Sequence, residues 1–312
     1  MSEVPFEFAV FGGEQIGEKA ALLKEYSGPL REVGFNIPRT KVIASETLEP
    51  LKTNLVLASE TEVDRGRAAF LGSMIAAICA SLGSTVAMVR SSAEGDARGT
   101  GVYRSVASPN HKHHIAEALQ QVLSSYHTPQ AVAFRQQHGL GGELAAMVQP
   151  LVGQKLNEDG EMYGPPLSGY GYSSTPHHSQ GVIKVVSGIG GGLGQAGEVI
   201  TPSDLEALKD RKLSFPSRPV LGLVASGVNK RLEKRPIGVH KSSTSAAEDI
   251  ELPLGRVLRL FEPADLLERL RRLERLTGVA MYIEWALTVE EGGLRFWAVQ
   301  ATPLEDRHEI RL

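Results

Sequence analysis

The sequence predicts a mixed α/β fold, and two observations carry that prediction. Segments with the apolar spacing of helices alternate with short runs typical of strands along most of the chain. Turns containing glycine or proline, such as those at Gly83 and Pro38, separate these segments, and no internal repeat is visible. Such alternation is typical of helices packed on the faces of a sheet.

In the first half of the chain, strands and helices are expected in turn. A helix over 16–26 carries Ala20 and Leu23 on an apolar face, and the long amphipathic helix over 63–82 ends at Gly83. The expected strands are 6–11, 41–44, 85–89 and 144–152, and the further helices are 115–126 and 129–137.

The second half of the chain is less regular. Residues 157–197 are rich in glycine and serine around a strand expected at 182–186. Residues 209–253 are basic and weakly periodic, which indicates an insertion or a loosely packed hairpin. A helix over 263–278 carries a stripe of leucines. Two final strands are expected at 280–287 and 294–301.

Composition excludes several classes of protein. With 312 residues, of which 42% are hydrophobic and 22% charged, the chain has the make-up of an ordinary globular protein. Its net charge of −3 argues against nucleic acid as a partner. The single cysteine, Cys79, cannot form an internal disulfide, and no signal-like start or apolar run of about 18 residues is present. A cytoplasmic protein with no membrane segment is therefore expected.

The most informative motif is the segment 89–93, Val-Arg-Ser-Ser-Ala, which ends an apolar strand and opens a glycine-containing loop. A guanidinium at that place can donate two parallel hydrogen bonds to phosphate oxygens, while the loop offers backbone N–H groups. Arg90 is therefore a candidate phosphate ligand. By itself the motif also fits a solvated junction between a strand and a loop.

Three further motifs add candidates. Lys19 comes early in a helix after Gly17, where an anion could bind, although a surface lysine fits equally. The apolar strand at 147–152 could offer backbone groups to a flat base, or could belong to the core. Glu284 and Gln300 fall on neighbouring strands, where a carboxylate and an amide oxygen could face a metal-bound phosphate.

In their order along the chain, these motifs resemble the N-terminal ATP-binding domain of the pyruvate phosphate dikinase and phosphoenolpyruvate synthase family, in a stand-alone form. Eight segments match motifs of that family in the same order, and they span nearly the whole chain. The segments are 17–19, 34–38, 89–93, 133–135, 148–152, 168–176, 192–195, and the pair 282–286 and 299–303.

The resemblance implies an ATP-grasp fold, with two lobes around a nucleotide cleft, and it implies ATP and Mg²⁺ as cofactors. Residues 1–150 would form one lobe and 151–312 the other, with the insertion near 209–253. The implied site consists of Lys19 and Arg90 for the phosphates, Gly101 in a covering loop, Gln149, Leu151 and Val152 for adenine, and Glu284 and Gln300 for magnesium and the phosphates. Arg90, Glu284 and Gln300 would be the catalytic residues.

In that family, the domain phosphorylates a histidine on a separate swivelling domain. The 312 residues contain no counterpart of that histidine domain. The resemblance therefore implies an ATP-binding phosphotransferase component, a kinase that passes a phosphoryl group from ATP to a histidine on a separate partner protein.

The chain also departs from the family pattern. Tyr282 stands where the family has aspartate, Gln195 where it has glutamate, and Thr302 where it has arginine. Each change removes a charge of the kind that phosphoryl transfer uses, and hydroxyl groups cannot replace a formal charge. An alternative function follows, in which a catalytically degenerate module binds nucleotide or a partner as a regulator or scaffold.

Two groups of histidines invite a metal or phosphohistidine interpretation. They are His111, His113 and His114, and the pair His177 and His178. Neither group has a carboxylate or cysteine frame visible in the sequence, so this interpretation is the less favoured one.

Overall fold

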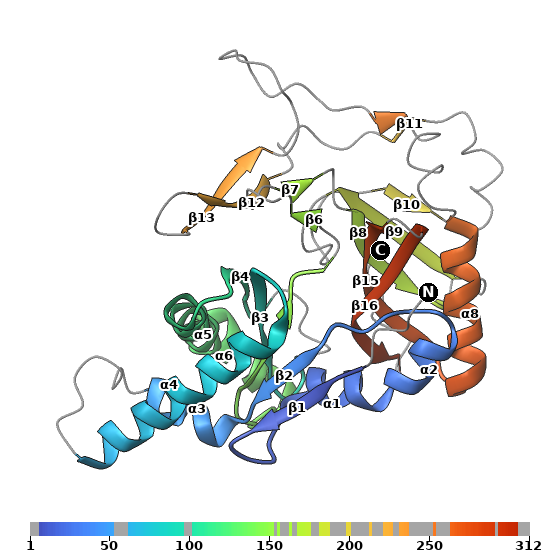
Figure 1. The fold of residues 1–312 in the computed structure, drawn as a ribbon. Helices are drawn as coiled ribbons and strands as arrows, with labels where there is room; N and C mark the ends of the chain where they lie inside the picture. Colours follow the sequence, from blue (N-terminus) through green and yellow to red (C-terminus); the bar gives the residue numbers. More distant parts are fainter. Residues whose placement is uncertain are drawn as a thin grey trace.

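The computed structural model shows two five-stranded sheets, each covered by helices on its outer side (Figure 1). No helix in the part of the chain that the structure describes combines the length and apolar character needed to span a membrane. The described residues are 6–52, 62–96, 102–152, 155–156, 162–163, 167–175, 181–187, 198–200, 212–213, 221–226, 231–236, 252–253, 263–290 and 293–304.

The first sheet has the strand order β1-β2-β5-β3-β4. β1 and β2 run parallel, and the other neighbouring strands are antiparallel. The strands are β1 (Phe8–Phe11), β2 (Thr40–Ile43), β3 (Val86–Ser92), β4 (Ser105–Pro109) and β5 (Ala145–Pro150).

Four helices cover the outer face of the first sheet, where Val89 of β3 and Val148 of β5 pack in one core with Ile78 and Leu119. These helices are α3 (Ser45–Lys52), α4 (Glu62–Leu82), α5 (Lys112–Tyr126) and α6 (Pro129–His138). Because side chains alternate along a strand, Val89 points to this core and Arg90 points to the opposite face. That opposite face is turned toward the second sheet.

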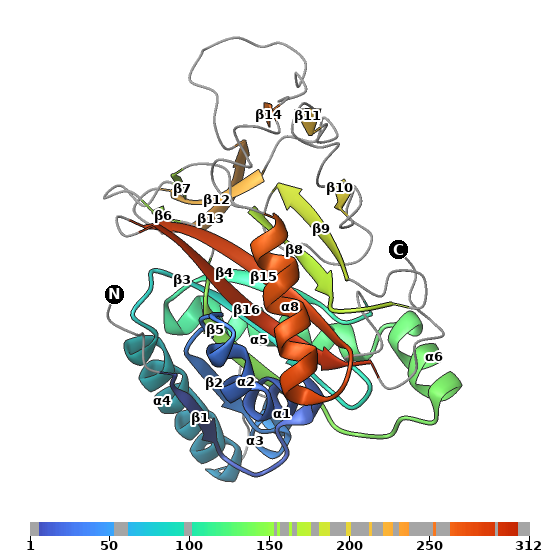
Figure 2. The same ribbon diagram turned by 90° about the vertical axis from the view of Figure 1, so that its right-hand side faces the viewer.

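The second sheet has the strand order β10-β9-β8-β15-β16, with antiparallel neighbours. Its outer face is covered by α8, whose leucines, including Leu270 and Leu273, pack against Ile283 and Trp285 (Figure 2). The elements are β8 (Leu167–Tyr172), β9 (Val182–Ser187), β10 (Glu198–Ile200), α8 (Pro263–Thr277), β15 (Met281–Glu290) and β16 (Gly293–Pro303).

Three short antiparallel strand pairs lie beyond one end of the two sheets (Figures 1 and 2). β12 and β13 form the hairpin pairing that was one of the two expectations for 209–253. The pairs are β6 (Lys155–Leu156) with β7 (Met162–Tyr163), β11 (Lys212–Leu213) with β14 (Leu252–Pro253), and β12 (Leu221–Ser226) with β13 (Arg231–Pro236).

The N-terminal part of the chain joins the two sheets. In α1 (Gly17–Glu25), Ala20 packs with the first sheet, while Leu23, one turn later, packs in the core of the second. After α2 (Ser27–Glu32), Asn36 pairs with the edge of β16: its N–H donates to the carbonyl of Phe296 at 2.7 Å. α1 therefore holds its side chains at the boundary between the sheets.

The alternation of strands and helices that the sequence predicts is confirmed, with ends shifted by a few residues. Several elements were not expected, among them α2, α3, β4 and β8. The reason is clearest for β8, where glycines alternate with tyrosines. A Cβ on Gly171 would lie 2.5 Å from Leu270 Cδ1, so the glycines let α8 approach the strand closely. Local propensity alone disfavours a glycine-rich strand, and tertiary packing overrides it here.

Candidate nucleotide-binding site

The start of α1 is docked on the end of β3. Gly17 has φ +70°, and a Cβ there would lie 1.8 Å from the carbonyl oxygen of Ser92, so only glycine fits. The N–H of Ala20 donates to Ser92 Oγ at 3.0 Å, and the N–H of Glu18 donates to the carbonyl of Ala93 at 3.3 Å. These helix N–H groups thus have protein partners, and Lys19 is placed beside β3.

Lys19 is a buried cation with a buried partner. Its Nζ lies 2.8 Å from Oδ1 of Asp96, and the two residues are 8% and 0% exposed. The other Asp96 oxygen accepts from the N–H of Ala93 at 3.4 Å. A lysine held in this way is not the surface lysine that the isolated motif allowed.

Arg90 reaches across from β3 to the second sheet. Its Nη1 lies 3.4 Å from Oε2 of Glu284, a residue 194 positions further along the chain. The Nε of Arg90 is buried and has no hydrogen-bond partner among the residues that the structure describes. A buried N–H of this kind is costly unless a partner arrives, so the guanidinium keeps a donor available for an anion.

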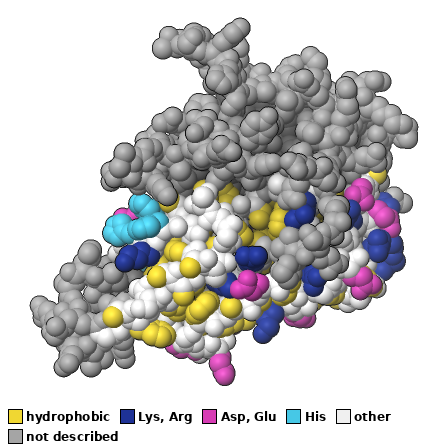
Figure 3. All heavy atoms as spheres, in the orientation of Figure 1, with side chains coloured by type: hydrophobic (Ala, Val, Ile, Leu, Met, Phe, Trp, Pro, Cys, Tyr) yellow, Lys and Arg dark blue, Asp and Glu magenta, His cyan; other side chains and the backbone are white. Residues whose placement is uncertain are grey.

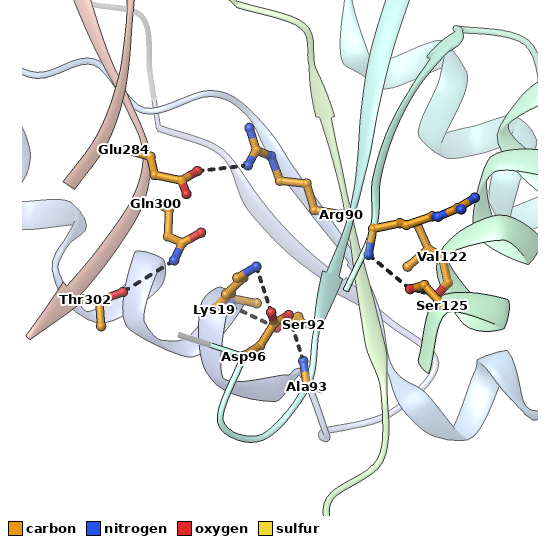
Figure 4. A network of polar contacts seen from close by, with 12 residues as sticks. Lys19, Arg90, Ser92, Ala93, Asp96, Val122, Ser125, Glu284, Gln300 and Thr302 are labelled. Atoms are coloured by element: carbon orange, nitrogen blue, oxygen red, sulfur yellow. Dashed lines mark hydrogen bonds and ion pairs between the residues drawn. The ribbon is translucent and has the colours of Figure 1, made fainter. Parts of the chain in front are cut away.

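Glu284 and Gln300 are direct cross-strand neighbours on β15 and β16, as the sequence predicts. Figure 4 shows that Arg90, Glu284, Gln300 and Lys19 extend into the same space between the two sheets. Gln300 is 2% exposed and its Nε2 donates to Oγ1 of Thr302 at 3.5 Å. The predicted phosphate and metal residues therefore do come together, although they derive from four separate parts of the chain.

A cluster of buried tyrosines lies next to Glu284 on the same face of the second sheet. The hydroxyl of Tyr282 donates to Oε1 of Glu284 at 3.2 Å, and the Tyr282 ring centroid is 5.8 Å from that of Tyr170 and 5.2 Å from that of Tyr172. Burial, and next the charge of Glu284, raises the pKa of Tyr282 well above its ordinary value of 10.0. Tyr282 is therefore a neutral hydrogen-bond donor at physiological pH.

The three residues implied for adenine contact lie at the end of β5 and just after it. The Gln149 side chain is 1% exposed and donates to Thr40 Oγ1 at 2.9 Å, so its amide group is committed to β2. The Leu151 N–H donates to the carbonyl of Val86 at 3.0 Å. Val152 packs against the cluster of Ala286, Trp297 and Val299 on the second sheet. Of the three, Val152 is the one that contacts the second sheet here.

Several predicted residues fall outside this site. Four of them lie outside the described residues, namely Gly101, Gln195, His177 and His178. The other three histidines gather at the start of α5, on the face of the molecule that Figure 3 shows, where His113 and His114 each lie 3.3 Å from Glu117. Within the described ranges, no three His, Cys, Asp or Glu side chains are arranged to hold a metal ion.

The residues around Glu284 fit magnesium poorly. Mg²⁺ is usually held by one or two free carboxylates together with substrate phosphates. Here both oxygens of Glu284 already accept hydrogen bonds, one from Arg90 and one from Tyr282. Gln300 offers an amide oxygen, and the other carboxylate drawn in the site in Figure 4, that of Asp96, is paired with Lys19.

Two contributions to this site were not foreseen as functional. Asp96 was not singled out in the sequence, and Ser92 only as part of the motif at 89–93, yet they hold Lys19 and the start of α1. Their burial depends on contacts between segments more than 70 residues apart, because the Ala20–Ser92 bond spans 72 positions. The one available signal is an acid three residues after the Ser-Ser-Ala sequence.

Comparison with known families agrees with this geometry. Residues 58–311 match the family described as the pyruvate phosphate dikinase AMP/ATP-binding domain, and the chain belongs to this family. No curated protein is similar enough to count as a match. The family model confirms the expected family and mixed α/β class, an ATP-grasp type of fold, and makes the chain a nucleotide-binding domain. The matched range includes Arg90, Glu284 and Gln300, whereas Lys19 precedes it.

Proposed function

We propose that this protein binds an adenine nucleotide between its two sheets, with Lys19 and Arg90 at the phosphates, and that the bound nucleotide controls its association with a separate protein. The observation that carries the proposal is the contact of Arg90 with Glu284 at 3.4 Å, beside the donor from Tyr282. The cations that bind phosphate are kept, while the groups around them that would drive transfer are neutral.

The two cations favour a phosphate ligand. Both are held by carboxylates, Arg90 by Glu284 and Lys19 by Asp96, and their side chains are 12% and 10% exposed. In such a partly dehydrated environment, charge-assisted hydrogen bonds to phosphate are strong. A phosphate group that enters between them would exchange these internal partners for its own oxygens. The base would then lie toward Val152, which packs on Trp297 of the second sheet.

A second candidate is the phosphotransferase function that the family pattern implies. Arg90, Glu284 and Gln300 would be the catalytic residues, with Mg²⁺ at Glu284 and Gln300, and the acceptor would be a histidine on a separate protein. A phosphorus–oxygen bond of ATP would break, and a phosphorus–nitrogen bond to the imidazole would form. What favours this candidate is the pairing of Glu284 with Gln300 across β15 and β16. Thr302 argues against this candidate, because it stands where the family pattern has an arginine. An arginine that contacts the transferring phosphoryl group raises the rate by a factor of roughly 10³ to 10⁵.

Calorimetric titration combined with product analysis separates the two candidates. We expect wild-type protein to bind ATP or AMP and to form no ADP or AMP from ATP when imidazole is supplied as a surrogate for the acceptor histidine. Product formed in excess of the protein would instead support phosphotransfer. Thr302→Arg provides the internal comparison, because a restored cation should raise any slow turnover. Absence of binding by every adenine nucleotide would rule out both candidates.

A further inference from the structure

We infer that this site binds its nucleotide without a divalent cation, and that it therefore takes a nucleoside monophosphate in preference to magnesium-bound ATP. The inference rests on the nucleotide site proposed at Lys19 and Arg90 and specifies its ligand. Three features of the described residues carry it: the contacts of Glu284, the tyrosine that stands beside it, and the number of cations.

Both oxygens of Glu284 are already engaged by donors of the chain itself. Its Oε2 faces Nη1 of Arg90 at 3.4 Å, and its Oε1 accepts the hydroxyl of Tyr282 at 3.2 Å. Both donors direct positive charge or a polar hydrogen at the carboxylate, as a metal ion would. A divalent cation would compete with these donors for the carboxylate, and a buried guanidinium that loses its carboxylate carries an unpaired charge.

Tyr282 fills the position next to Glu284 with a ring that cannot move away easily. The residue is 4% exposed and packs against Tyr170 and Tyr172 in one cluster. Its cross-strand partner on β16 is Thr302, and the partner of Glu284 is Gln300, so both of these cross-strand partners are neutral. A phenol hydroxyl is a poor ligand for magnesium, which prefers carboxylate and phosphate oxygens.

The charges at the site favour a ligand with few phosphate groups. Lys19 and Arg90 supply two positive charges, and their carboxylate partners Asp96 and Glu284 balance them. A phosphate monoester, with a charge of about −1.5 to −2 at neutral pH, therefore already adds net negative charge to the site. Each further phosphate adds more, which disfavours a triphosphate where no metal ion offsets its charge.

Calorimetry on the full wild-type chain tests the inference directly. AMP and ATP are each titrated in excess Mg²⁺ and in EDTA. We expect the affinity for AMP to be unchanged by the metal, and AMP to bind at least about tenfold more tightly than ATP in Mg²⁺. ATP that binds about tenfold more tightly in Mg²⁺ than in EDTA would overturn the inference and leave the proposed nucleotide site intact. No binding of either nucleotide would refute the proposed function, and the inference with it.

Two variants at position 282 test whether Tyr282 is responsible for the exclusion of the metal ion. Tyr282→Asp supplies a second carboxylate beside Glu284, and we expect its affinity for ATP to become about tenfold tighter with Mg²⁺ than with EDTA. Tyr282→Phe is the matched control, because it keeps the ring and removes the hydroxyl from Glu284 without adding a carboxylate, so its gain in metal dependence should be clearly smaller than that of Tyr282→Asp. A phenylalanine variant that gains as much metal dependence as the aspartate variant would contradict the role given to a second carboxylate. The wild-type comparison stands by itself if Tyr282→Asp does not fold.

Discussion

The two sides of the proposed site differ in the charge of their side chains. On the side of the first sheet, Lys19 and Arg90 are cations with fixed partners, and the start of α1 is locked on β3 by Ser92. On the side of the second sheet, Glu284 is charged, and the residues paired with it on the adjacent strands, Gln300 and Tyr170, are neutral, as is Tyr282. In the proposed function, the first side holds an anion, and the second side lacks the charges that would act on it.

This difference separates binding from transfer within one fold. Holding a phosphate needs donors that are fixed in place before the ligand arrives, and the first sheet supplies them. Moving a phosphoryl group also needs charge opposite the donors, either from a metal ion or from an arginine. In this chain Tyr282 and Thr302 occupy the two positions that would provide it. A protein can therefore keep the first function while losing the second.

The largest effect is expected where the start of α1 docks on the end of β3, because this contact fixes the position of Lys19. Gly17→Ala should lower the free energy of unfolding by about 3 kcal/mol, because the new Cβ would meet the Ser92 carbonyl at a positive φ. Chemical denaturation measures the loss. Gly72→Ala in α4 is the control, since a Cβ there meets nothing within 4 Å, and it should leave stability unchanged or slightly raised. Equal losses in both variants would show that the docking of α1 on β3 is unimportant.

The next effect concerns the cation that links the two sides. Arg90→Ala should weaken nucleotide binding roughly 10-fold to 100-fold, because a charge-assisted hydrogen bond is worth about 1.5–3 kcal/mol. Titration calorimetry gives the affinity. Arg275→Ala, on a side chain 62% exposed on α8, serves as the matched removal of an arginine and should have no effect. An unchanged affinity in Arg90→Ala would mean that the phosphates bind elsewhere.

The smallest effect tests the neutral character of the second side. Because burial raises the pKa of Tyr282, the folded protein keeps this phenol protonated at pH values where the unfolded chain, with a pKa near 10.0, ionises it. The contribution of this neutral phenol to the free energy of unfolding is therefore fully present below about pH 10, and it is lost as the pH rises toward the pKa of Tyr282 in the folded protein. At about pH 11 the loss should reach about 1 kcal/mol for this residue.

Denaturant unfolding at pH 8 and at about pH 11 measures that loss. In Tyr282→Phe the fall in stability between the two pH values should be smaller by the contribution of one phenol, about 1 kcal/mol. An identical fall in wild type and variant would show that Tyr282 ionises as easily in the folded protein as in the unfolded chain.

Sequence motifs pointed to residues of the proposed site wherever the motif is a short, local segment. Arg90, Glu284 and Gln300 were identified because each lies in a short recognisable segment, and the structure brings them together. Gln149 shows the limit of such reasoning. Its motif indicated adenine contact, yet its side chain bonds Thr40, which lies 109 residues away. Asp96 shows the converse, since nothing local marks it as the partner of Lys19.

The sequence by itself determined the alternation of strands and helices, the apolar faces that bury them, and the order of motifs that identifies the family. Only the tertiary structure decided that Arg90 meets Glu284 and that Tyr282 takes the second oxygen of that carboxylate. These contacts depend on how the two sheets pack and on the strand pairing that places Gln300 opposite Glu284. Local sequence carries no signal for such contacts, because their geometry arises from segments far apart in the chain.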